Sequence, residues 1–133
     1  MAEEIVVKEL LSDKKIEAGK QLIQKLESRG IDVAGALWLF HAESSAWKLT
    51  LAFSHVSEKG ARGFYERVQK AIDRLGNPEV SLGEVRVLDS GDPLIKALRH
   101  TIKTGSKDLT TIRLTRNMVD GRYIEDALVY RMK

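Results

Sequence analysis

The sequence predicts a single α/β (α+β) domain over residues 1–133, with helices packed on a five-stranded mixed sheet. A chain of 133 residues, 43% hydrophobic and 31% charged, is typical of one globular domain with a substantial core. Two pairs of β-rich runs, Ala36–Phe53 and Thr110–Met132, are each interrupted by a short turn. Amphipathic runs with helical spacing precede and separate them. The predicted order of elements is α-β-β-α-β-α-β-β.

The first predicted helix follows Ser12, a favourable N-cap, and ends before Gly30, a residue type common just after helix C-termini. Its apolar and small residues recur at helical spacing: Ile16, Gly19, Leu22, Ile23 and Leu26. The preceding run, Met1–Leu11, is ambiguous. Its Ile5-Val6-Val7 fits either a short edge strand or a forward extension of the helix.

The hairpin at Ala36–Phe53 organises the fold, because it holds both tryptophans and two of the three phenylalanines. We expect a four-residue loop from Glu43 to Ala46, since the tip lacks a glycine for a tight two-residue turn. The expected opposed pairs are Ala42–Trp47, Phe40–Leu49 and Trp38–Leu51. Directly opposed residues share a face, so this register predicts one aromatic, core-facing side.

In the second half of the chain, predicted helices and strands again alternate. Ser57 is expected to cap a helix that ends at Gly76, and a strand is expected within Val80–Leu88. Asp92 and Pro93 are expected to start a third helix that Gly105 closes. The dipeptide Asp120-Gly121 predicts a type I′ turn in the last hairpin. The expected opposed pairs there are Leu114–Ala127, Ile112–Val129 and Arg116–Glu125.

Several segments together resemble a class of small uncharacterised bacterial proteins. They read Ala-Leu-Trp-Leu-Phe, Trp-Lys-Leu, Asp-Pro-Leu-Ile-Lys-Ala-Leu and Ile-Glu-Asp-Ala-Leu-Val-Tyr-Arg, and the resemblance extends over most of the chain. The class has no assigned activity and no catalytic motif. The resemblance therefore implies a bacterial origin and nothing about chemistry.

Composition excludes several classes of function. The chain has no cysteine, so disulfides and thiolate metal sites are excluded. The acidic start Met-Ala-Glu-Glu is unlike a signal peptide, and no apolar run approaches a membrane span, so we expect a cytoplasmic protein that does not bind a membrane. The net charge of +3 permits a polyanionic partner without requiring one.

No set of residues predicts catalysis, a metal site or a cofactor. His41 and Glu43 share a strand face but lack a third ligand, because His55 is expected far along the ladder. Glu125 and Asp126 are neighbours on a strand and point to opposite faces. Gly19-Lys20 lacks the flanking residues of a phosphate-binding loop. The sequence thus leans against an enzyme.

Two basic groupings are candidate binding sites. The first, at the start of the second helix, combines small residues that leave backbone N–H groups open with two cations, and it predicts anion binding. Its residues are Ser57, Lys59, Gly60, Arg62 and Gly63. The second lies along the third helix and predicts nucleic-acid contact. Its residues are Lys96, Arg99, His100, Lys103 and Lys107. The alternative for both is a capped helix with solvated charges.

The remaining candidate is an interface for self-association. Three helices and a two-faced sheet leave apolar surface if the helices gather on one face, and a two-fold dimer would bury it. The residues of this surface are Leu37, Leu39, Ile124, Leu128 and Tyr130. The first hypothesis is therefore a non-enzymatic domain that acts through protein association. The alternatives are a nucleic-acid or phosphate-ligand binder, and an unrecognised hydrolase or nuclease.

Overall fold

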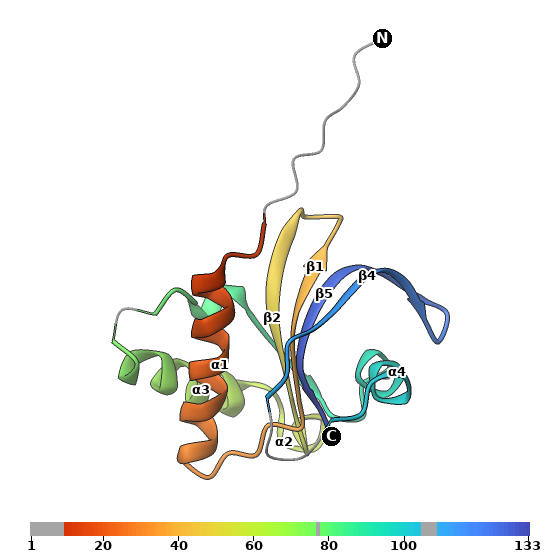
Figure 1. Cartoon of the computed structure of the whole chain (residues 1–133). Coiled ribbons are helices and arrows are strands. Elements are labelled where there is room, and N and C mark those ends of the chain that lie inside the picture. Colours follow the sequence, from red (N-terminus) through yellow and green to blue (C-terminus); the bar gives the residue numbers. More distant parts are fainter. Residues whose placement is uncertain (1–9, 77, 105–108) are drawn as a thin grey trace.

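The computed structural model describes residues 10–76, 78–104 and 109–133, and it confirms the predicted fold class and order of elements (Figure 1). Five strands form one sheet in the order β3-β2-β1-β5-β4. Their bounds are β1 Gly35–His41, β2 Ala46–Phe53, β3 Val85–Asp89, β4 Ile112–Val119 and β5 Arg122–Met132. The sheet is mixed, because β2 and β3 are parallel while the other neighbours are antiparallel.

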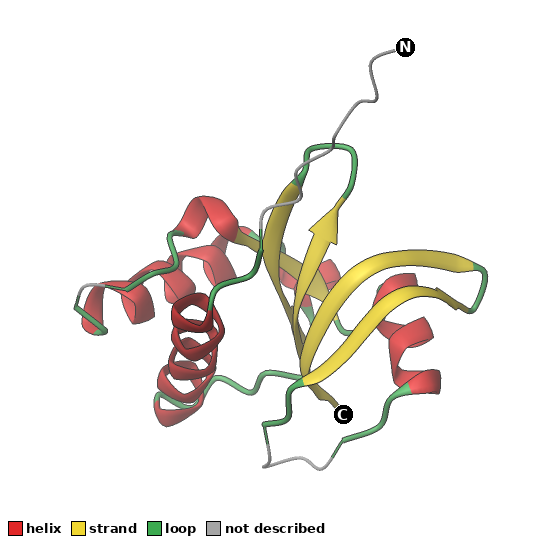
Figure 2. Cartoon of the chain, turned by 45° about the horizontal axis from the view of Figure 1, so that its top comes forward, coloured by secondary structure: helices red, strands yellow, loops and turns green. Residues whose placement is uncertain are grey.

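Helices cover both faces of the sheet. Their bounds are α1 Asp13–Ser28, α2 Val56–Lys59, α3 Arg62–Arg74 and α4 Pro93–Thr101. Helices α1 and α3 lie on one face and α4 lies on the other (Figure 2). The side chain of Ser12 accepts a hydrogen bond from the Lys15 amide, and that of Asp92 accepts one from the Leu94 amide, so the predicted caps of α1 and α4 are confirmed.

Two predicted elements have different bounds. Gly60, with φ of 82°, separates the four-residue α2 from α3, so Ser57 lies inside α2 and does not cap a longer helix. The strand expected within Val80–Leu88 begins only at Val85, because a short 3-10 turn, Leu82–Glu84, precedes it. The predictions for Ile5-Val6-Val7 and Gly105 lie outside the described residues.

The predicted register of the first hairpin is wrong by two residues. Trp38 pairs with Leu49 and Phe40 with Trp47. The loop keeps the predicted length of four residues but spans residues 42–45, where Ser45 adopts a φ of 50° and its amide donates to the Ala42 carbonyl. A shift of two residues keeps every side chain on its predicted face, since side chains alternate with a period of two.

The aromatic face of the sheet is the larger core. Trp38 is fully buried there beneath α1, and its Nε1–H donates to the Tyr130 hydroxyl at 2.9 Å. That hydroxyl in turn donates to the Ile16 carbonyl of α1 at 2.5 Å. Burial raises the pKa of Tyr130, so the phenol stays neutral and can donate. The network joins the sheet to α1 across the core.

The second face of the sheet is covered within the chain, which corrects the predicted interface. Leu37, Leu39 and Ile124 are buried in a cluster that includes Ile95 and Leu98 of α4. Leu128 and Tyr130 are buried in the other cluster, under α1 and α3. None of the five expected interface residues is exposed, because the helices are divided between the two faces.

The second hairpin keeps its predicted pairs Leu114–Ala127 and Ile112–Val129, and Asp120 and Gly121 have positive φ values of 47° and 78°. The expected Arg116–Glu125 ion pair is absent among the described residues. Arg116 has a φ of 50°, and Glu125 accepts a hydrogen bond from the Tyr123 hydroxyl instead. The ion pair of this hairpin is a bidentate contact between Arg113 and Asp126, at 2.6 and 2.7 Å.

Candidate functional site

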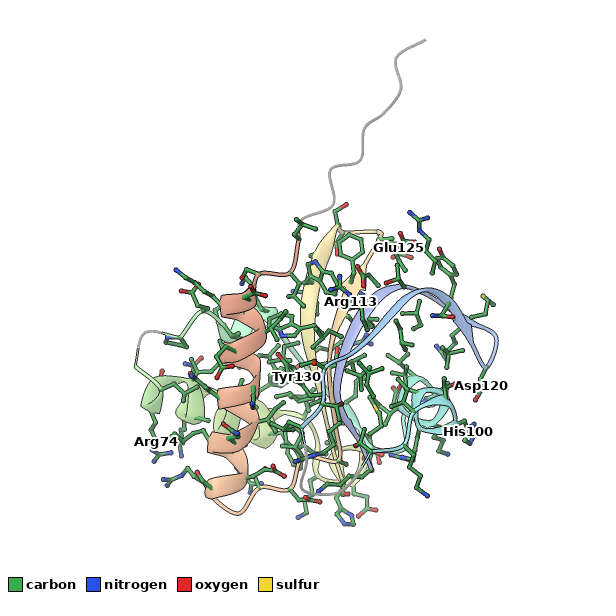
Figure 3. All side chains as sticks on the ribbon, viewed as in Figure 1. Arg74, His100, Arg113, Asp120, Glu125 and Tyr130 are labelled. Atoms are coloured by element: carbon green, nitrogen blue, oxygen red, sulfur yellow. The ribbon has the colours of Figure 1, made fainter. Side chains whose placement is uncertain are left out.

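The sheet splits at one end and leaves a cleft between the two hairpins. Pairing of β1 with β5 runs from Gly35–Met132 to Leu39–Ala127, and no further pair of these two strands is recorded along their described residues. Beyond that point the β4–β5 hairpin bends away from β1 and over α4 (Figures 1 and 2). A hydrogen bond between Nδ1 of His100 on α4 and the Asp120 carboxylate, at 2.7 Å, holds its tip (Figure 3).

We call this feature the split-sheet cleft. It has a volume of about 610 Å³. Its walls are residues 39–44 of the first hairpin, Arg86 of β3, Leu94 of α4 and residues 122–125 of β5. A volume of this size is typical of pockets that hold small organic ligands.

His41 lines the split-sheet cleft and is neutral at physiological pH. Burial lowers its pKa, and the nearby positive charges of Arg86 and Lys48 lower it further, while Glu43 acts in the opposite direction. Its Nε2 is buried and has no hydrogen-bond partner among the described residues. The other histidines stand elsewhere, His55 beside Glu58 and His100 beside Asp120.

A second cleft, of about 410 Å³, lies between the C-terminal halves of α1 and α3. Four cations line it, and we call it the basic cleft: Arg29, Arg67, Lys70 and Arg74. The last three recur at intervals of three and four residues, which places them on one side of α3. Arg29 is the C-cap of α1, and packing of Leu26 near Ala71 brings it to the same depression.

The cations of the basic cleft have no ion pair with any described residue. The acidic residues close to them in sequence are engaged elsewhere. Glu27 binds the buried Arg131 at 2.5 Å, Asp32 pairs with Lys133, and Asp73 accepts from the Gln69 amide at 2.8 Å. None of the described residues that line the cleft is acidic. It therefore concentrates positive charge that no described residue neutralises.

The predicted anion site at the start of the second helix is filled by the chain's own carboxylate. Asp89 accepts hydrogen bonds from the Ser57 amide at 3.0 Å and from the Gly91 amide at 2.7 Å. Arg62, now at the start of α3, pairs with Glu66 at 3.3 Å. The break at Gly60 also separates the five residues between two helices, so Ser57, Lys59, Gly60, Arg62 and Gly63 do not form one site.

Asp89 should make stability depend on acid pH. The Ser57 and Gly91 amides lower its pKa below the ordinary value of 3.8. A lowered pKa means that the ionised carboxylate stabilises the fold above that value, and that this contribution is lost as the pH falls through the folded pKa. We expect Asp89→Asn to lower the free energy of unfolding near neutral pH and to converge with the wild type once the pH falls below the folded pKa of Asp89. Urea titrations across this range measure it, and a difference that is independent of pH would contradict it.

The predicted nucleic-acid residues do not form a continuous charged surface. Lys96 and Lys103 are exposed, but Arg99 is half-buried and donates to the Ser90 carbonyl at 3.1 Å. His100 is paired with Asp120, and Lys107 lies outside the described residues. In Figure 3, His100 lies on the opposite side of the molecule from Arg74 of the basic cleft.

Sequence reasoning missed the basic cleft. The signal on α3 was present, because Arg67, Lys70 and Arg74 have helical spacing. Glu66 stands four residues before Lys70, a pairing interval, but the structure pairs Glu66 with Arg62. The contribution of Arg29 was not visible, since it depends on how α1 packs against α3. The split-sheet cleft had no sequence signal beyond the pair His41 and Glu43.

Two further features, a metal site and a membrane-spanning helix, are not found within the described ranges. No group of three His, Cys, Asp or Glu side chains there is placed to hold a metal ion. No described helix has the length and apolar character needed to cross a membrane. Comparison with known proteins finds no matching family model, no matching curated protein and no matching solved structure.

Proposed function

We propose that the chain is a non-enzymatic binding domain whose ligand is a compact, multiply phosphorylated anion held in the basic cleft. The observation that supports this most directly is that four cations line one concave site whose described lining contains no acidic residue. Positive charges gathered in a depression raise the local concentration of an anionic ligand. Phosphate-ligand binding is one of the alternatives that the sequence left open. The sequence analysis placed anion binding at the start of the second helix, whereas this proposal places it in the basic cleft.

Helix dipoles do not account for the whole cluster. Arg29 and Arg74 lie at helix C-termini, where a cation is favourable in any protein. Arg67 is in the middle of α3 and gains nothing from the helix end. Its guanidinium lies 5.5 Å from the Phe64 ring centroid, which steadies its direction without neutralising its charge. Three arginines also present planar, forked donors that match phosphate oxygens.

The lining favours a compact phosphate ligand over a nucleic-acid strand. Apart from the cations, it consists of aliphatic and glycine residues, with no aromatic ring to stack on a base. The charges also converge on one depression and do not extend as a track along the surface. A ligand with several phosphates close together would contact all four cations at once.

The association hypothesis has lost its main support. Its surface is buried under α4 and within the aromatic core. Exposed apolar side chains do occur on the β4–β5 hairpin, at Met118 and Tyr123. The edge strand β4, however, carries Arg113 and Arg116, and Arg116 has a positive φ; charges and irregular backbone both oppose pairing between sheet edges. Sedimentation at micromolar concentration still decides the oligomeric state.

The test is binding of inorganic triphosphate, measured by calorimetry at low salt. We expect Arg67→Gln combined with Arg74→Gln to weaken binding by at least about tenfold, because each charge-assisted hydrogen bond contributes roughly 1.5–3 kcal/mol. The matched control is Lys96→Gln on α4 combined with Lys103→Gln just after this helix, which removes the same charge and should leave affinity within about twofold.

Two results would count against the proposal. Equal losses in both double variants would show that only net charge matters. Tighter binding of single-stranded DNA than of triphosphate, without competition between them, would favour a nucleic-acid surface instead. Circular dichroism of each variant establishes that the fold is retained, which is expected because all four altered side chains are exposed.

A further inference from the structure

The split-sheet cleft differs from the basic cleft in both position and chemistry. It opens where β1 and β5 stop pairing, on the face of the sheet that α4 covers. Strand β1 continues to His41 and β5 begins at Arg122, so both strands extend beyond their last shared pair, Leu39–Ala127. The walls therefore include segments of β1 and β5 whose backbone groups are not paired between these two strands.

The cleft combines apolar side chains with charged ones. Leu39, Leu94 and Ile124 come from β1, α4 and β5, and they supply an aliphatic surface. Arg86 comes from β3 and Arg122 from the start of β5. Neither arginine has an ion pair within the described part of the chain.

The charge balance of this cleft argues against a multiply charged ligand. Glu43 and Glu125 also line it, so its formal charges cancel and a multiply charged phosphate would be repelled as well as attracted. Glu125 is held by the Tyr123 hydroxyl at 2.9 Å, and Glu43 is exposed. The two arginines, like Glu43, have no ion pair with a described residue, while His41, being neutral, adds no charge.

We propose that the split-sheet cleft binds a small amphiphilic monocarboxylate, with its hydrocarbon part on Leu39, Leu94 and Ile124 and its carboxylate between Arg86 and Arg122. Arginine forks pair with carboxylates through two parallel hydrogen bonds. Burying the apolar part of the ligand supplies affinity that a bare anion such as acetate would lack. The cleft of about 610 Å³ accommodates a molecule of this class.

The first test uses the unaltered protein and octanoate as the probe. We expect saturable binding, with amide chemical shifts moving first in residues 39–43 and 122–125. Octanol, which keeps the chain and lacks the charge, should bind at least about tenfold more weakly, and so should acetate. Absence of saturable octanoate binding below about 10 mM, or octanol binding as tightly as octanoate, would overturn the proposal.

The second test uses charge variants. Arg86→Gln and Arg122→Gln should each weaken octanoate binding by about tenfold, which corresponds to about 1.4 kcal/mol. The control is Arg116→Gln, an exposed arginine of the same hairpin that does not line the cleft. A loss in the control equal to that in the two variants, or no loss in either variant, would overturn the assignment of the carboxylate to Arg86 and Arg122. Triphosphate binding should be unchanged in all three, so this test is independent of the basic cleft.

Discussion

Replacing Trp38 with alanine is expected to lower the free energy of unfolding by about 3–5 kcal/mol. The indole is fully buried between β1 and α1, and it donates to Tyr130 at 2.9 Å. Alanine would leave a cavity in the larger core and would remove one of the two hydrogen bonds that the Tyr130 hydroxyl makes. Urea denaturation monitored by circular dichroism measures the change.

Two variants separate the contributions to this loss. Trp38→Phe keeps most of the side-chain volume but removes the indole N–H donor. Its cost in free energy of unfolding should therefore be clearly smaller than that of Trp38→Ala. Trp47→Ala should also cost less, because Trp47 lies beside the turn of the first hairpin. The Arg113 guanidinium lies 5.5 Å from the centroid of its ring there. A free energy for Trp38→Ala within about half a kcal/mol of wild type would contradict the burial of this face.

Replacing Gly19 with alanine is expected to destabilise the protein by about 1–3 kcal/mol, although alanine is the better helix former. A Cβ atom at this position of α1 would collide with the Tyr130 hydroxyl and would lie 2.9 Å from Trp38 Nε1. Both atoms belong to aromatic side chains buried in the core, and the Tyr130 hydroxyl also donates a hydrogen bond to the Ile16 carbonyl of α1. Either α1 must move away from the sheet or the network must break.

The matched control is Gly63→Ala in α3. A Cβ atom there meets no other atom within 4 Å. The same substitution should therefore stabilise the protein by up to about 1 kcal/mol through helix propensity alone. Opposite signs for the two variants are the expected result of parallel urea titrations. If Gly19→Ala is as stable as Gly63→Ala, the close approach of Tyr130 to α1 is refuted.

The two proposed sites can be tested separately because different layers build them. The basic cleft belongs to α1 and α3 on one face of the sheet. The split-sheet cleft involves α4 and the second hairpin on the other. A variant of Arg74 therefore has no direct contact with the carboxylate site, and a variant of Arg122 has none with the phosphate site. Failure of one proposal leaves the other standing.

Much of the fold was determined by local sequence. The caps Ser12 and Asp92 satisfy amides within the first helical turn, and Asp120-Gly121 supplies two positive φ values at adjacent positions. These features depend on residues close together in the chain, as do the periodicities of apolar residues. The prediction of element order and of the second hairpin's register was correct for that reason.

The register of the first hairpin could not be predicted from local sequence. Its apolar alternation determined which face Trp38 and Phe40 occupy, because that depends only on parity. The pairing partner depended on the turn, and nothing in Ser44-Ser45 indicates that Ser45 adopts a positive φ. Arg116 is a second case. Its φ is positive and it does not pair with Glu125, and the ion pair of this hairpin joins Arg113 to Asp126. Neither residue type favours that conformation by itself.

Both candidate sites were decided by tertiary structure. The sequence showed two apolar sheet faces but not how three amphipathic helices divide between them, since any of them can cover either face. Packing of α1 on α3 adds Arg29 to the cations of α3 and leaves their charge unneutralised. The bend of the β4–β5 hairpin ends its pairing with β1 at Leu39 and leaves Arg122 in the lining of the same cleft as Arg86. Such placements sum many weak contacts between residues distant in sequence, and no local pattern encodes them.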